Sequence, residues 1–186
     1  MADKTDCMIR KIAITGPEST GKSMLAEQLA THYHSVWVPE YAREYLDLLG
    51  KPYEEKDILS IAQGQLSAEA SKLRQAGNFL FCDTELLVTK IWSEVKYGRC
   101  NPWILDAIET HSYDLYLLCD VDLPWEYDPL REHPDQRQYL FDLYFNELKN
   151  RNYPFAVVRG TGHDRLTNAI KIIENFAFYL NPIADI

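Results

Sequence analysis

The sequence has no long apolar run: none of its hydrophobic stretches approaches the about 20 residues that a membrane-spanning helix requires. The N-terminal residues also lack the apolar core of a secretory signal peptide. The four cysteines are widely spaced, with no C-x-x-C pair, so we expect reduced thiols rather than a disulfide framework. These absences predict a cytoplasmic protein with no membrane partner.

Basic residues are scarce. The chain has 19 lysines and arginines against 28 aspartates and glutamates, which gives a formal net charge of −9 at pH 7. Proteins that bind nucleic acid nonspecifically neutralise phosphates with clustered basic residues, so the sequence argues against a nucleic-acid partner. A local basic pocket for a small phosphorylated ligand is still compatible with this charge.

The sequence also lacks repeats, low-complexity tracts and any linker that would separate two domains. Instead, short apolar runs alternate with longer segments of helical period. The predicted strands are 11–15, 35–38, 79–83, 114–119 and 155–159. The predicted helices are 22–33, 41–49, 54–76, 86–97, 135–150 and 164–179. Apolar strands that alternate with helices indicate an α/β fold with a five-stranded parallel sheet flanked by helices. In such sheets, ligands bind beyond the carboxyl ends of the strands.

The first of these ends carries a glycine-rich loop. The spacing G-x-x-x-x-G-K-S runs from Gly16 to Ser23, between a predicted strand and a predicted helix. Backbone N–H groups of such a loop surround phosphate oxygens, the lysine reaches the β- and γ-phosphates, and the serine hydroxyl binds Mg²⁺. We therefore predict a site for a nucleotide and Mg²⁺ at Gly16, Pro17, Glu18, Ser19, Thr20, Gly21, Lys22, Ser23 and Met24.

Two further strand ends carry carboxylates. Asp83 ends the third predicted strand, where P-loop proteins place an acid near the metal, although a helix cap is the alternative for this residue. We predict that Asp83 is the acid on the metal side and that Glu85 assists it. Glu40 follows the second strand, where a carboxylate can accept a proton from a substrate hydroxyl.

Two later loops carry arginines. Arg131 and Arg137 stand on either side of Pro134, in a segment that two prolines keep out of a helix. Arginines on a closing loop neutralise the charge of a phosphoryl group in transfer and exclude water. A solvated surface turn is the alternative for this segment. The loop 159–165, which follows the fifth strand, is placed to surround the nucleotide base. Trp92 is expected to pack in the core or at its rim.

Together these residues resemble the nicotinamide riboside kinase domain of the NadR type, a family of P-loop kinases. The shared motifs are "GPESTGKS", "EYAREY" (40–45), "IAQGQ" (61–65), "FCDTE" (81–85), "YDLYLL" (113–118), "PWEYDPLR" (124–131) and a late "HDR" that ends at Arg165. They cover almost the whole chain from Lys11 onward, in the same order. One departure is that the family commonly has an aromatic residue before the Glu-Tyr pair, where this chain has Pro39. Trp37 either substitutes for that residue or packs in the core.

The resemblance implies a single P-loop kinase domain over residues 1–186, with a flexible segment 1–10 and an arginine-bearing lid. It implies ATP and Mg²⁺ as cofactors and a small nucleoside-like substrate, with transfer of phosphate to the 5′-hydroxyl of a riboside. The implied catalytic residues are Lys22, Glu40, Asp83, Arg131 and Arg137, and Arg165 joins the nucleotide site. The implied substrate-binding residues are Trp37, Glu40, Tyr41, Arg43, Glu85, Trp125 and Asp128. The alternatives are a regulatory ATPase or nucleotide-binding switch, and a kinase for another nucleoside or small metabolite.

Overall fold

The computed structural model describes residues 9–180, with side-chain placements through residue 176. Its centre is a sheet of five parallel strands in the order β2-β3-β1-β4-β5. The strands are β1 (Arg10–Thr15), β2 (Val36–Val38), β3 (Phe79–Asp83), β4 (Leu115–Cys119) and β5 (Phe155–Val158). The helices are α1 (Lys22–His32), α2 (Tyr41–Leu49), α3 (Glu55–Leu73), α4 (Leu86–Tyr97), α5 (Pro102–Thr110), α6 (Arg137–Asn150) and α7 (Gly162–Leu180).

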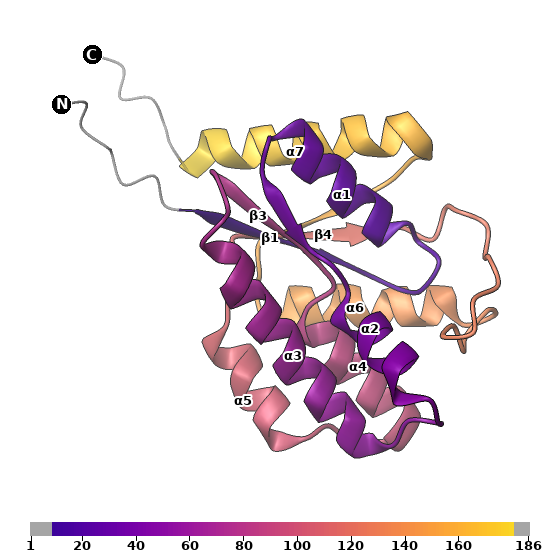
Figure 1. The fold of residues 1–186 in the computed structure, drawn as a ribbon. Coiled ribbons are helices and arrows are strands. Elements are labelled where there is room, and N and C mark those ends of the chain that lie inside the picture. The colour runs from indigo at the N-terminus through magenta and orange to yellow at the C-terminus, as the bar shows by residue number, and fades with distance from the viewer. Residues whose placement is uncertain (1–8, 181–186) are drawn as a thin grey trace, which may run out of the picture.

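Helices cover both faces of the sheet. Helices α1 and α7 lie on one face, and α3, α4, α5 and α6 lie on the other (Figure 1). Each face has its own cluster of buried apolar side chains, so the strands are buried on both sides, and every residue of β4 is buried. This double burial is the reason why the strands are apolar without alternation, as parallel strands usually are.

The register of the sheet decides which loops meet. The first strand, β1, lies at the centre: Ile14 pairs with Asp83 of β3 on one side and with Leu117 of β4 on the other. Strand β2 lies beyond β3 at the edge of the sheet. Because all five strands are parallel, the loops that follow β1, β2, β3 and β4 emerge at the same end of the sheet.

The predicted fold class is confirmed, with element boundaries within three residues of those expected. The sequence interpretation missed α5. Its signals were present, since the side chain of Asn101 accepts the N–H of Trp103 and Pro102 occupies the first turn. Of the segment 1–10, for which we expected flexibility, residues 1–8 and Cys7 with them lie outside the described residues, and Arg10 belongs to β1.

The other three cysteines are free thiols, and Cys82 and Cys119 are buried in strands β3 and β4. Between residues 9 and 180, no helix combines the length and the apolar character needed to cross a membrane.

Candidate active site

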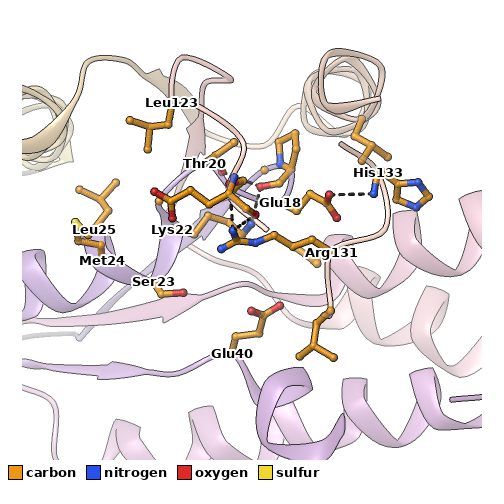
Figure 2. A pocket seen from close by; sticks show the side chains of 18 of the residues that line it. Glu18, Thr20, Lys22, Ser23, Met24, Leu25, Glu40, Leu123, Arg131 and His133 are labelled. Atoms are coloured by element: carbon orange, nitrogen blue, oxygen red, sulfur yellow. Dashed lines mark hydrogen bonds between the residues drawn. The ribbon is translucent and has the colours of Figure 1, made fainter. Parts of the chain in front are cut away.

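The carboxyl ends of the strands surround a cavity of about 610 Å³. Its wall includes the whole loop from Gly16 to Ser23, together with Glu40 after β2 and Arg131 in the long loop between β4 and α6. Figure 2 shows the side chains of Lys22, Ser23, Glu40 and Arg131 directed toward this common space. Residues that are more than one hundred positions apart in the chain therefore share one site.

The glycine-rich loop is a P-loop, and its backbone requires its glycines. Gly16 has φ +128°, and a Cβ atom there would lie 3.0 Å from the backbone oxygen of Cys119. Gly21 caps α1 in the left-handed conformation, with φ +74°. A side chain is strained at such φ values, so the curled loop that exposes its N–H groups depends on glycine at these positions.

Lys22 begins α1, and its Nζ donates to the backbone oxygen of Pro17 at 2.7 Å. The ammonium group thus folds back over the loop and lines the cavity. The positive end of the α1 dipole lies at the same place. This end of the cavity is therefore suited to bind an anion such as a phosphate chain.

Asp83 is almost fully buried at the end of β3, and its Oδ1 atom has no hydrogen-bond partner. Burial raises the pKa of Asp83 to about 6, and the negative charge of Glu40 adds to this rise. The Ser23 hydroxyl, the Lys22 ammonium and the backbone N–H of Glu40 lie close enough to lower the pKa in the opposite direction. A buried carboxylate oxygen without a partner is an unusual feature that calls for a ligand.

The residues around Asp83 fit a magnesium ion. Within residues 9–180 there is no group of three or more His, Cys, Asp or Glu residues that could hold a metal alone. Mg²⁺ is usually held by one or two protein oxygens together with phosphate oxygens and water, so this finding is compatible with it. The unpartnered Oδ1 of Asp83 and the nearby hydroxyl of Ser23 would supply the two protein oxygens.

Glu40 is the residue before α2, at its N-cap position, but its carboxylate makes no capping hydrogen bond. The side chain lines the cavity and points into it (Figure 2). A carboxylate that is free of structural bonds and faces a site for phosphates can accept the proton of a hydroxyl group there.

Glu85 has a structural role. It is 2% exposed, and its carboxylate accepts the Leu87 N–H at 2.6 Å and the Thr15 hydroxyl at 2.9 Å. It is therefore the cap of α4 and not one of the residues that line the cavity. Burial raises the pKa of Glu85 to about 7. Capping, which we considered for Asp83, belongs to Glu85 instead, because the chain turns at Thr84 before the helix begins.

The segment 120–136 folds over the P-loop as a lid. Glu18 connects the two: it accepts the indole N–H of Trp125 at 3.0 Å and the backbone N–H groups of Glu132 and His133 at 3.0 and 2.9 Å. Glu18 and His133 are joined in Figure 2. The carboxylate of Glu18 therefore holds the lid in place. The groups of this loop that are suited to bind phosphate are its backbone N–H donors.

The two lid arginines differ in position. Arg131 lines the cavity, and its Nη1 donates to the Ser19 hydroxyl at 3.2 Å and to the backbone oxygen of Glu126 at 2.6 Å. Arg137 begins α6 and is not among the residues that line the cavity. Its Nη1 donates to the backbone oxygens of Ser19 and Leu123, at 3.2 and 2.9 Å. Arg137 thus fastens the base of the lid to the P-loop.

Arg165 is 4% exposed and lines the cavity from α7. Its guanidinium donates to the backbone oxygen of Thr20 at 3.0 Å and pairs with Asp122. Arg165 thus contacts the P-loop through the backbone of Thr20, and its predicted role in binding the nucleotide stays a prediction.

Several predicted substrate residues lie elsewhere. Trp37 packs with the apolar cluster under α1 and α7, so of the two alternatives the structure has core packing. Tyr41 lies against Gly64 of α3 and lines a separate surface groove.

The other predicted substrate residues take part in lid contacts. Trp125 binds Glu18, and Arg43 of α2 pairs with Asp128 of the lid at 3.0 Å. Of this last pair, only Arg43 lines the cavity.

Beyond Glu40, the cavity continues into an apolar section that the sequence interpretation missed. Its aromatic residues are Trp92 of α4 and Tyr144 of α6; the aliphatic ones are Ala42, Leu46, Val88, Ile91, Val95, Leu130 and Leu140. The only available signal was the helical spacing of Val88, Ile91, Trp92 and Val95. That spacing marks an apolar helix face but does not distinguish core from cavity.

Comparison with known proteins agrees with this geometry. A family model described as an AAA domain matches residues 11–165. The trifunctional NAD biosynthesis/regulator protein NadR of Salmonella typhimurium and that of Escherichia coli are each 27% identical over 175 residues, which is 89% of this chain and 42% of NadR. The chain therefore spans less than half the length of these relatives.

Solved structures share the fold. NadR in complex with NAD and AMP-PNP has a TM-score of 0.74 at 19% identity, over 90% of this chain and 49% of that one. Deoxyadenosine kinase from M. mycoides with bound dATP has a TM-score of 0.55 at 18% identity, over 89% and 99% of the two chains. The chain belongs to the AAA domain family and has the fold of a NadR-type P-loop kinase domain.

Proposed function

We propose that this protein transfers the γ-phosphate of ATP, with Mg²⁺, to the 5′-hydroxyl of nicotinamide riboside, giving nicotinamide mononucleotide and ADP. The observation that carries the proposal is the shape of the cavity. One end is formed by the P-loop, the other end is apolar, and the carboxylate of Glu40 faces the space between them. Such a cavity has room for a phosphate donor and for an acceptor that carries a flat ring.

The roles of the residues follow from their positions. The P-loop N–H groups and Lys22 bind the phosphate chain, and Ser23 and Asp83 hold Mg²⁺, which neutralises charge on the phosphates. In the transfer, the 5′-oxygen forms a bond to the γ-phosphorus while the bond from that phosphorus to the β–γ bridging oxygen breaks. Glu40 accepts the proton that the hydroxyl group loses, and Arg131 stabilises the charge on the phosphoryl group between the two oxygens.

The choice of acceptor rests on relatives and on the apolar section. NadR was solved in a complex with NR, at a TM-score of 0.73 and 20% identity to this chain. The apolar section, with Trp92 and Tyr144 in its wall, suits the ring of a nucleoside. If the ring of a nucleoside binds in this apolar section, its ribose lies toward Glu40.

The test is a panel of nucleosides, including nicotinamide riboside, that is incubated with Mg·ATP while both ADP and phosphorylated nucleoside are quantified. We expect one nicotinamide mononucleotide for each ADP, and a higher kcat/KM for nicotinamide riboside than for the other nucleosides. Lys22→Ala should abolish transfer with little change in thermal unfolding, because it removes a charge directed at phosphate. Lys51→Ala, at an exposed lysine, is the matched control.

Other outcomes identify the alternatives. ADP without any phosphorylated nucleoside would favour a regulatory ATPase or a nucleotide-binding switch. Preferred phosphorylation of another nucleoside would retain the kinase and replace the acceptor. Normal turnover in Lys22→Ala would remove the P-loop from the active site.

A further inference from the structure

Helix α2, which follows Glu40, has no cap of its own. An N-cap side chain normally accepts an N–H of the first helical turn, but Glu40 makes no such bond. The Oε1 atom of Gln65 on α3 accepts the N–H of Tyr41, the first residue of α2, at 3.0 Å instead. Gln65 thus performs the capping, and the carboxylate of Glu40 stays available to the cavity.

The other end of the same amide reaches the residue that directly follows Asp83 and strand β3. The Nε2 atom of Gln65 donates to the backbone oxygen of Thr84 in a long hydrogen bond of 3.5 Å. The orientation of the amide follows from its partners, because the N–H of Tyr41 requires an acceptor and the carbonyl of Thr84 requires a donor. Gln65 is 3% exposed, so no water competes freely for either bond.

Thr84 occupies a backbone conformation that needs support. Its φ is +69°, a value that residues other than glycine rarely adopt. Its N–H donates to the backbone oxygen of Ile14 at 3.0 Å, and Gln65 contacts its carbonyl. The turn directly after Asp83 is therefore held from both sides, by β1 and by α3.

Gly64, the neighbour of Gln65, provides the second contact to α2. A Cβ atom at Gly64 would overlap the ring of Tyr41, so the absence of a side chain lets that ring lie directly on α3. The ring and the N–H of Tyr41 are thus both held by two consecutive residues of α3.

We propose that Gln65 is a positioning residue that sets the distance between Glu40 and Asp83, by binding the residue that follows each of them. This inference rests on the function proposed above, in which Glu40 receives the hydroxyl proton and Asp83 holds Mg²⁺. The two carboxylates repel each other, while the carboxylate of Asp83 also lies close to the backbone N–H of Glu40. Gln65 connects the backbones of Tyr41 and Thr84, and it is not among the residues that line the cavity.

The test compares Gln65→Met with Gln63→Met. Methionine retains the length and volume of glutamine but cannot form the two hydrogen bonds, and Gln63 is an exposed glutamine on the same helix. In Gln65→Met we expect faster hydrogen exchange at the Tyr41 amide and a kcat reduced by about tenfold to a hundredfold, since small displacements of catalytic groups cost that much. The affinity for ATP without Mg²⁺ should stay within about threefold, because the P-loop is untouched. Gln63→Met should match the parent in all three measurements.

A merely structural role would lower the thermal midpoint and leave kcat unchanged at temperatures where the variant is folded. That result, or unchanged exchange at Tyr41, would overturn the proposal. Gly64→Ala disturbs the same contact by displacing the Tyr41 ring, and it should lower kcat in the same way. It decides the question if Gln65→Met does not fold, and an unchanged kcat in Gly64→Ala would then count against the proposal.

The measurements distinguish an error in the proposed function from an error in the positioning role of Gln65. If the parent protein phosphorylates no nucleoside, the proposed function is wrong, but the exchange at Tyr41 and the gain in ATP affinity on adding Mg²⁺ can still be measured. A smaller gain in Gln65→Met than in Gln63→Met, with faster exchange at Tyr41, would still support the positioning role. An equal gain in the two variants would contradict it.

Discussion

The carboxylate of Glu18 accepts the backbone N–H of His133 at 2.9 Å, although the two residues lie 115 positions apart in the chain. Glu18 belongs to the P-loop and His133 to the lid, so this bond ties the phosphate-binding loop to the segment that covers it. The same carboxylate accepts two more N–H groups from the lid, those of Trp125 and Glu132. Glu18 is therefore one main tether of the lid, beside the contacts of Arg137 with Ser19 and of Arg43 with Asp128.

Glu18→Gln should loosen the lid. Glutamine removes the negative charge and turns one acceptor into a donor that faces N–H groups, so at least one of the three bonds is lost. We expect kcat to fall by about tenfold, because closure completes the site, and proteolysis within residues 120–136 to accelerate. Glu27→Gln, at an exposed acid on α1, is the control. Equal proteolysis rates in the two variants would show that Glu18 does not hold the lid.

Substitutions of Asp83 and of Glu40 should change the Mg²⁺ dependence of activity in different ways. Asp83→Asn should raise the Mg²⁺ concentration needed for half-maximal activity, and Glu40→Gln should slow transfer at an unchanged Mg²⁺ requirement. Titration of Mg²⁺ against kcat in both variants is the measurement. The same Mg²⁺ dependence in the two variants would refute this division of roles.

The acid limb of the pH–rate profile should also depend on Mg²⁺. Because burial raises the pKa of Asp83 to about 6, protons compete with the metal at the lower end of the physiological range. In the proposed mechanism, protonation of Asp83 would remove a metal ligand, so activity at low Mg²⁺ should fall as the pH drops through about 6. Raising the Mg²⁺ concentration should move this fall to lower pH. If activity falls at the same pH at every Mg²⁺ concentration, Asp83 is not the group whose protonation causes the fall.

Replacing Arg131 and replacing Arg137 should affect activity and stability differently. Arg131 lines the cavity, so Arg131→Ala should cut kcat about a hundredfold or more, with nearly unchanged ATP affinity. Arg137 bonds to the backbone oxygens of Ser19 and Leu123, so Arg137→Ala should lower both kcat and the thermal midpoint. Steady-state kinetics with ATP binding measured separately tests both, with the exposed Arg74→Ala as control. Unchanged kcat in both variants would end the lid hypothesis.

Glu85 should make stability depend on pH. Its pKa is raised from 4.5 to about 7, so the folded state binds the proton more tightly than the unfolded state does. The stability that Glu85 contributes is thus fully present below about pH 4.5 and is lost as the pH rises through about 7. Glu85→Gln has no charge to bury, and it should raise the urea midpoint relative to the parent at pH 8 more than at pH 5. A difference that does not vary with pH would show that Glu85 does not titrate in this range.

The parts of the site that the sequence predicts are those set by local pattern. Gly16, Gly21 and Lys22 follow from the P-loop spacing, and the position of Asp83 follows from the end of an apolar strand. These inferences hold because a parallel sheet brings the ends of its strands together whatever the details of packing. Gly16, Gly21 and Lys22 line the cavity, whereas Asp83 is buried and is not among the residues that line it.

Side-chain direction could not be predicted in the same way. Trp37 lies on a strand with helices on both faces, so its apolar character fits either face, and packing placed it under α1 and α7. Trp92 and Gln65 sit on helices whose rotation is set by contacts with distant segments. Glu85 and Asp83 are two residues apart, and the left-handed turn at Thr84 decided which of them caps α4.

The central place of β1 also determines when the site forms during synthesis. Although β1 is made first, its neighbours are β3 and β4, so Ala13 acquires its partner Tyr116 only after more than half of the domain has been translated. A nascent chain that ends before residue 119 has a P-loop sequence but no strand on one side of it. We therefore expect the nucleotide site to form late in biosynthesis, so that a bound nucleotide would stabilise only those chains that extend beyond β4.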